Sequence, residues 1–89
     1  MLKVEKSGKF KKEYKLALKR GVSRDEIDKV LWALIKRENL NPKYKDHALL
    51  GNYVGRRECH IKNDYLLIYK YEPGKIIFER LGTHSDLFK

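Results

Sequence analysis

Five side chains in the second half of the chain could together transfer protons and bind an anion. Histidine exchanges protons near neutral pH, and the planar guanidinium of arginine can hold a phosphate through two hydrogen bonds. Several histidines that converge on one cleft would suit acid–base chemistry beside a phosphate. The residues concerned are His47, His60, Asp64, Arg80 and His84.

Strand parity predicts where His60 points. In a strand over residues 56–61, Glu58 and His60 share one face, which we expect to be exposed, and Cys59 lies on the other as a small core residue. Asp64, in the turn that follows, could orient His60 and stabilise its imidazolium form. The alternative role of Asp64 is that of a turn former.

Arg80 and His84 are four residues apart near the C-terminus. We expect Arg80 to end the last strand and Gly82 to permit a sharp bend, so that the guanidinium and the imidazole meet at one phosphate. Phe88 is interpreted either as a core residue or as a ring on which an RNA base stacks.

The histidines could also have one of two roles unrelated to proton transfer. They could be scattered surface residues, or they could be ligands of a metal ion together with Asp64 and Cys59. Cys59 and His60 are adjacent on a strand and point to opposite faces, and no pair of ligands has the spacing of a known metal motif. We therefore expect no metal and no other cofactor.

Composition points to an anionic partner. The 89 residues, which we interpret as one domain (1–89), carry 21 basic and 12 acidic side chains and a net charge of +9. Residues 1–45 hold 14 of the basic and 6 of the acidic side chains, so the basic surface belongs mainly to the first half. Nucleic acid, an anionic membrane surface or an acidic protein would fit this excess. The sequence contains no apolar run of about 20 residues and no signal-peptide centre, so we expect a cytoplasmic protein.

Hydrophobic spacing predicts an α+β fold. A short N-terminal strand precedes a basic helix over Lys9 to Arg20, in which Lys12, Lys15 and Lys19 share one side. Gly21 ends that helix, and the sequence "SRDE" predicts a reciprocal cap at the start of a second helix. Three antiparallel strands follow, over residues 56–61, 65–71 and 75–81. The two helices should cover one face of the sheet and leave the other face for function.

Three separated motifs, "DHALLGNY", "RECHIKNDYLLIYKY" and "FERLGTHSDLF", resemble the YafQ branch of the RelE/ParE superfamily of bacterial toxins, and the similarity spans nearly the whole chain. This resemblance implies a compact RelE-like fold and metal-independent cleavage of mRNA, commonly in the ribosomal A site. Tyr65 stands where tryptophan is frequent in the family. By motif, the positions that are functional in the family are His47, His60, Asp64, Arg80, His84 and Phe88.

The resemblance also implies partners and an RNA-binding surface. The expected partners are an acidic antitoxin that inactivates the toxin, mRNA and the ribosome. Two alternatives remain at this point: a ParE-like toxin that inhibits a protein such as gyrase, and a noncatalytic RNA-binding module. The side chains expected to contact RNA are Lys12, Lys15, Lys19, Arg57, Tyr65 and Phe88.

Overall fold

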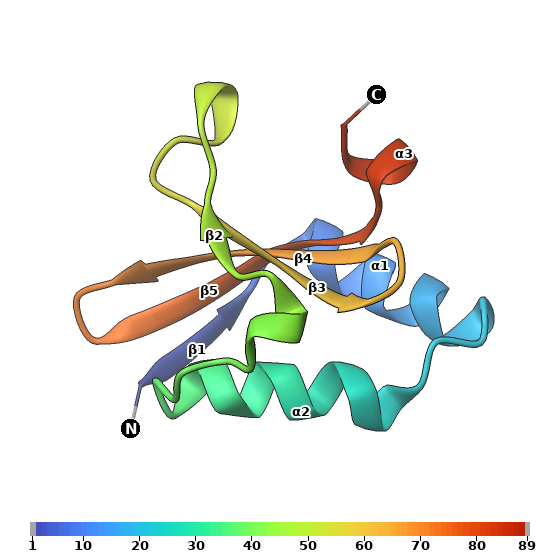
Figure 1. Cartoon of the computed structure of the whole chain (residues 1–89), viewed down its shortest axis with the longest axis horizontal. Helices are drawn as coiled ribbons and strands as arrows, with labels where there is room; N and C mark the ends of the chain where they lie inside the picture. The colour runs from blue at the N-terminus through green and yellow to red at the C-terminus, as the bar shows by residue number, and fades with distance from the viewer. Residues whose placement is uncertain (1, 89) are drawn as a thin grey trace.

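The computed structural model describes residues 2–88 as a five-stranded sheet with two long helices on one face (Figure 1). Strand β1 (Lys3–Lys6) leads into helices α1 (Gly8–Lys19) and α2 (Arg24–Ile35). The strand order is β1-β5-β4-β3-β2, in which β1 runs parallel to β5 and every other pair is antiparallel. The remaining elements are the short 3₁₀ helices η1 (Pro42–Tyr44) and η2 (Gly51–Tyr53), strands β2 (His47–Ala48), β3 (Arg57–Lys62), β4 (Tyr65–Glu72) and β5 (Lys75–Thr83), and helix α3 (His84–Leu87).

The predicted α+β class is confirmed, and the helix boundaries follow from local capping. The Ser7 side chain accepts a hydrogen bond from the Phe10 N–H at 2.9 Å, and Gly21 ends α1 with φ +88°. Ser23 accepts from the Glu26 N–H at 3.4 Å. The reciprocal cap also requires the Glu26 carboxylate to accept a hydrogen bond from the Ser23 N–H. This part of the prediction was wrong, because the Glu26 carboxylate faces the Lys62 ammonium at 3.4 Å instead.

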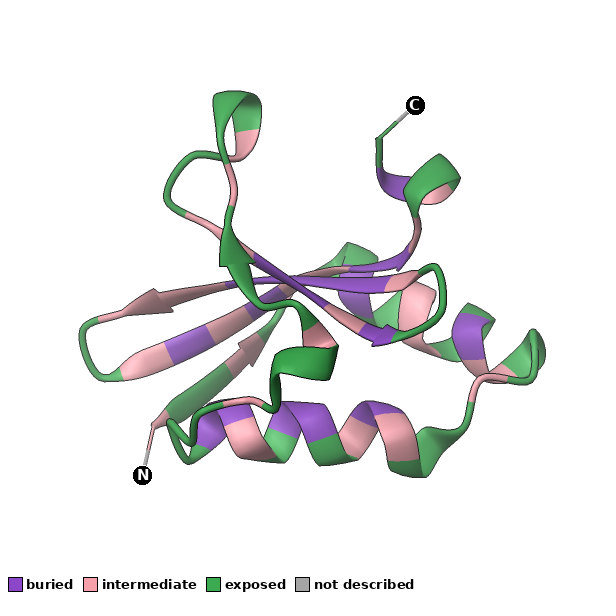
Figure 2. Cartoon of the chain, in the orientation of Figure 1, coloured by how far each residue is buried: buried purple, intermediate pink, exposed green. Residues whose placement is uncertain are grey.

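The main core lies between the sheet and the two long helices. Buried residues lie along the upper side of α2 and in the middle of the sheet (Figure 2). Because strand side chains alternate between faces and helix side chains recur every three to four residues, both patterns bring one apolar face to this layer. The cluster contains Phe10, Ala17, Ile27, Val30, Leu31, Leu34, Ile35, Cys59, Ile61, Leu67, Tyr69, Ile76, Phe78 and Leu81.

The opposite face of the sheet is partly covered, although we expected it to be open. Helix α3 and the β2–η2 segment rise from this face (Figure 1), and Leu87 from α3 packs on Leu66 and Ile68 of β4. Under the same cover Glu58 is only 4% exposed. The prediction that Glu58 lies on an exposed face was wrong, because β2 pairs with β3 at that residue.

Gly82 does not form the predicted bend. It is a buried residue of β5, which continues past Arg80 to Thr83. A Cβ atom on Gly82 would lie 2.9 Å from Cβ and Oδ2 of Asp86, so glycine is required here for the close approach of α3 rather than for a turn. No helix within residues 2–88 is both long and apolar enough to cross a membrane.

Candidate functional site

Two neighbouring rows of side chains cross the sheet on the face that carries α3. Residues directly opposite each other in antiparallel strands point to the same face, so the strand register defines the rows. The two rows bring side chains from four strands together on one small surface, although these residues are far apart in the sequence. The first row is His47, Glu58, Ile68 and Arg80, and the second is His60, Leu66 and Gly82.

His84 and Asp64 form a direct pair at the end of the second row. The Nδ1 atom of His84 lies 2.9 Å from Oδ1 of Asp64, in the turn between β3 and β4. The hydrogen bond from the His84 side chain holds the pKa of Asp64 below its ordinary value. An ionised carboxylate only accepts hydrogen bonds, so Nδ1 carries the hydrogen and Nε2 of His84 is left for substrate. We expected Asp64 to orient His60, but its direct partner is His84.

Helix α3 presents His84, and two contacts fix this helix. Thr83 and Asp86 form a reciprocal capping box, in which the Thr83 N–H donates to Asp86 at 3.0 Å. Arg20, at the end of α1, donates from Nη1 to Oδ2 of Asp86 at 2.7 Å. His84 is therefore mounted on an anchored turn of helix rather than on a free tail.

Replacing Asp86 with asparagine should lower the melting temperature at pH 7 by roughly 4–8 °C, the shift that about 1 kcal/mol produces in a domain of this size. Arg20 holds the pKa of Asp86 at about 2, below the ordinary 3.8. A depressed pKa contributes stability above the ordinary value and loses it as the pH falls through the folded value. The melting temperatures of the wild type and the Asp86→Asn variant should therefore converge as the pH falls from 4 to 2. Thermal unfolding followed by circular dichroism measures them. A Ser85→Ala variant is the control, and equal melting temperatures at pH 7 would contradict the anchoring role.

His47 and His60 flank the buried carboxylate of Glu58. Nε2 of His47 lies 3.3 Å from Oε2 of Glu58, and Nε2 of His60 lies 3.9 Å from Oε1. Nδ1 of His47 also lies 2.7 Å from the carbonyl oxygen of Lys45. Both ring nitrogens of His47 thus face oxygens of the chain rather than solvent or substrate. Among the described residues, Oε1 of Glu58 is a buried oxygen with no hydrogen-bond partner.

Arg80 is held by an acid from the first helix. Its Nε donates to both carboxylate oxygens of Glu13, at 3.1 and 3.2 Å, and its Nη2 donates at 2.8 Å. Glu13 also accepts from the Leu81 N–H at 3.0 Å. The Glu13 hydrogen bonds raise the pKa of Arg80 above its ordinary value, so the guanidinium stays charged. The contacts to Glu13 occupy one edge of the guanidinium and leave Nη1 on the other.

An aromatic group borders the histidines. The Phe88 ring lies 5.6 Å from the His84 ring and 5.5 Å from the Tyr53 ring, and the His84 and His60 rings lie 6.2 Å apart. Phe88 is 38% exposed, whereas the neighbouring Leu87 is buried. The interpretation of Phe88 as a core residue was wrong, because the turn of α3 directs Leu87 into that position.

Several predicted RNA-contacting residues lie away from this cluster. Tyr65 packs against the helix-side core and accepts a hydrogen bond from Arg20 at 3.0 Å. Arg57 lies on the same helix-facing side of its strand and donates to Oδ1 of Asp46 at 3.3 Å. The same oxygen accepts a hydrogen bond from the Tyr69 hydroxyl. Three further predicted RNA contacts are exposed lysines of the first helix, namely Lys12, Lys15 and Lys19.

Three residues near the predicted site had no assigned role in the sequence analysis. Strand parity had placed Glu58 on the same face as His60, and this was the signal in the sequence that Glu58 lies near the site. Glu13 reaches Arg80 across 67 positions of sequence, and Tyr53 comes from an irregular segment, so neither gave a local signal.

Cys59 is a core residue, as predicted. It is fully buried, and desolvation raises the pKa of its thiol well above the ordinary value. Among residues 2–88, no group of three or more histidine, cysteine, aspartate or glutamate side chains is arranged to hold a metal ion.

Comparison with known proteins identifies the family. Residues 2–89 match the family described as "Bacterial toxin of type II toxin-antitoxin system, YafQ". The mRNA interferase toxin YafQ of Escherichia coli K12 is 40% identical over 86 residues, which cover 96% of this chain and 94% of that protein.

Solved structures agree with this match. The structure of the E. coli DinJ–YafQ complex contains a chain that is 38% identical and superimposes with a TM-score of 0.92, with 100% of each chain covered. A copper-bound mutant toxin from Helicobacter pylori is 40% identical, with a TM-score of 0.94 over 99% of this chain and 100% of the other. Matches of this extent in sequence and fold place the chain in the YafQ family of type II toxin–antitoxin toxins.

Proposed function

We propose that this toxin is an endoribonuclease that cleaves mRNA, on the ribosome and in the cytoplasm, by general acid–base catalysis without a metal ion. The observation that carries the proposal is the convergence of His60, His84 and Arg80, from three separate elements, on one partly covered face. The E. coli relative named as an mRNA interferase supports the same substrate. The histidines favour this activity over inhibition of a protein target, which needs no proton transfer.

The reaction requires three groups. The 2′-hydroxyl of RNA attacks the neighbouring phosphorus, one group removes the hydroxyl proton, and a second group protonates the 5′-oxygen as its bond to phosphorus breaks. A cation stabilises the charge that develops on the phosphorane. The products are a 2′,3′-cyclic phosphate and a 5′-hydroxyl end.

The chain offers a residue for each part. Asp64 holds Nδ1 of His84, which leaves Nε2 to exchange a proton with the substrate. His60, 6.2 Å from His84 between ring centres, supplies the second proton transfer. Arg80 stabilises the phosphate charge through Nη1, and Phe88 stacks on a base beside the cleaved bond.

The row that begins at His47 supports this arrangement. Because both nitrogens of His47 face oxygens, His47 acts as an electrostatic and positioning group that shares the Glu58 carboxylate with His60. The lysines of α1, namely Lys12, Lys15 and Lys19, contact the RNA backbone of the ribosome away from the cleaved bond. Arg57 and Tyr65, on the other side of the sheet, contribute to the wider RNA surface.

We further propose that an acidic antitoxin binds and silences the protein. The DinJ–YafQ complex provides the precedent in a relative. The net charge of +9 would attract an acidic segment and accelerate its association.

Cleavage assays test the proposed function. Purified protein should cut mRNA on translating ribosomes, and the cut RNA should carry 5′-hydroxyl ends whether or not a chelator is present. Naked RNA should be tested in parallel to measure the contribution of the ribosome. Loss of cleavage in the chelator would contradict the metal-independent mechanism. Inhibited growth without any cut RNA would contradict the nuclease assignment in favour of a protein target.

A further inference from the structure

A basic pocket opens at the border of the proposed catalytic cluster, and His60 forms part of its lining. It has a volume of about 500 Å³ and lies between α2, η1 and the end of β3. Within residues 2–88, strand β2 pairs only with Arg57 and Glu58, so the outer edge of β3 beyond them has no neighbouring strand. The pocket occupies this open edge. Its basic side chains are Lys29, Lys43, Lys45 and Lys62.

The charge of the pocket is largely uncompensated. Among the described residues that line it, Glu26 is the single acid, and its carboxylate faces Lys62 at 3.4 Å. Lys29, Lys43 and Lys45 are exposed and form no ion pair within residues 2–88. Three ammonium groups in one hollow repel one another, an arrangement that an anionic ligand would relieve.

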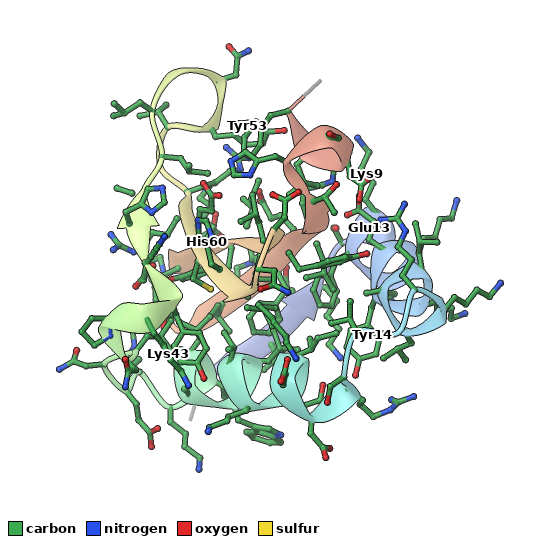
Figure 3. All side chains as sticks on the ribbon, turned by 45° about the vertical axis from the view of Figure 1, so that its right-hand side comes forward. Lys9, Glu13, Tyr14, Lys43, Tyr53 and His60 are labelled. Carbon is green, nitrogen blue, oxygen red and sulfur yellow. The ribbon has the colours of Figure 1, made fainter. Side chains whose placement is uncertain are left out.

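The pocket is built into the catalytic surface. His60 lines the pocket and lies 6.2 Å from His84, so one residue belongs to both places. The carbonyl oxygen of Lys45, a residue that lines the pocket, lies 2.7 Å from Nδ1 of His47. This contact connects the pocket to the row of side chains that begins at His47. Figure 3 shows Lys43 and His60 toward one side of the molecule, with Lys9 and Glu13 of α1 toward the other.

Tyr44 gives the pocket an aromatic wall. Its ring is partly exposed, and the ammonium of Lys43 lies 5.2 Å from the ring centre. Basic groups around an aromatic ring are the combination that single-stranded nucleic acid uses, with phosphates on the lysines and a base or sugar against the ring.

We propose that this pocket binds the backbone of the RNA strand that is being cleaved, on one side of the scissile bond. This inference rests on the proposed function, because it takes His60 as part of the cleavage site. A strand whose scissile phosphate lies at His60 and His84 meets the pocket directly, since His60 forms its rim. The pocket is thus a subsite that holds neighbouring nucleotides and sets the register of the cleaved bond.

Binding of short RNAs tests the subsite. The probes are a minimal RNA around one target bond and versions extended by about three nucleotides on either side, each with a 2′-deoxy nucleotide at the cleaved position so that the attacking hydroxyl is absent. The wild-type protein should bind one of the extended RNAs more tightly than the minimal one. A Lys29→Gln/Lys43→Gln/Lys45→Gln variant should lose this preference, and its salt dependence, log Kd against log salt, should become shallower by about 2.

A Lys3→Gln/Lys6→Gln/Lys36→Gln variant is the matched control, because it removes the same charge from exposed positions outside the pocket. It should keep the preference for the extended RNA. Both variants should melt at the wild-type temperature, since all six lysines are exposed.

Three results would decide against the subsite: an unchanged preference in the pocket variant, an equal loss in the control, or a pocket variant that loses only its affinity for the antitoxin. Failure of the proposed function has a different signature, since a protein that cuts no RNA on ribosomes can still show pocket-dependent binding of the uncleavable probes.

Discussion

Replacing His84 with alanine should lower the rate of RNA cleavage by about 10²–10⁴-fold, the range that general acid–base groups usually contribute. The variant should remain folded, because the His84 side chain is more than half exposed and its main side-chain contact is the Asp64 carboxylate. Single-turnover cleavage on ribosomes should lose rate with little change in binding. The pH–rate profile should lose one of its limbs, since one proton-transfer group has been removed.

Ser85→Ala is the control for this experiment, because Ser85 is the next residue of α3 and is also exposed. It should retain the wild-type rate. A loss under about tenfold in the His84 variant, or an unchanged pH profile, would argue that His84 only packs against Phe88 and does not transfer a proton.

The parts of the fold that could be predicted are those with local causes. The cap at Ser23 and the glycine at position 21 depend on residues within one turn, so the first helix and the start of the second could be located to within about one residue. The sequence "KND" predicted the turn between β3 and β4, where Asn63 has φ +51°. Such features require no knowledge of the rest of the chain.

The partner of Asp64 shows where local inference stops. His60 is four residues away and was the natural candidate, whereas His84 is 20 residues away. The β4–β5 register brings Thr83 opposite Tyr65 and thereby sets α3 beside the turn. That register depends on an irregularity after Ile68, which hydrophobic alternation alone did not predict.

Short elements account for the buried glutamate. The two residues of β2 and the single turn of α3 are too short to give a periodic pattern, yet together they cover the second face of the sheet. Glu58 is therefore buried on a face that strand parity alone marked as polar and exposed. Sequence reasoning identified the face of the site but not the cover over it.

Arg80→Lys should lower the cleavage rate by about 10²-fold or more, although the charge is conserved. Lysine has no planar fork, so it cannot hold Glu13 through one edge of a fixed plane and present an N–H to the phosphate from the opposite edge. Arg56→Lys is the matched control, because Arg56 is a partly buried arginine that pairs with Glu79, the residue before Arg80 on β5. The control should cleave at nearly the wild-type rate in single-turnover assays.

Glu13 should act on catalysis through Arg80 alone. Glu13→Gln keeps the side-chain shape but weakens the bonds that orient the guanidinium, so we expect a smaller loss of rate than in Arg80→Lys, with binding of RNA nearly unchanged. A double-mutant cycle measures the dependence: once Arg80 is lysine, Glu13→Gln should cost little further activity. If the two substitutions reduce the cleavage rate by independent factors, Glu13 supports only the fold, through its bond to the Leu81 N–H. Melting temperatures of the wild type, the two single variants and the double variant would measure that contribution separately. A positioning role requires the rate effect of Glu13→Gln to vanish with the arginine while its effect on melting persists.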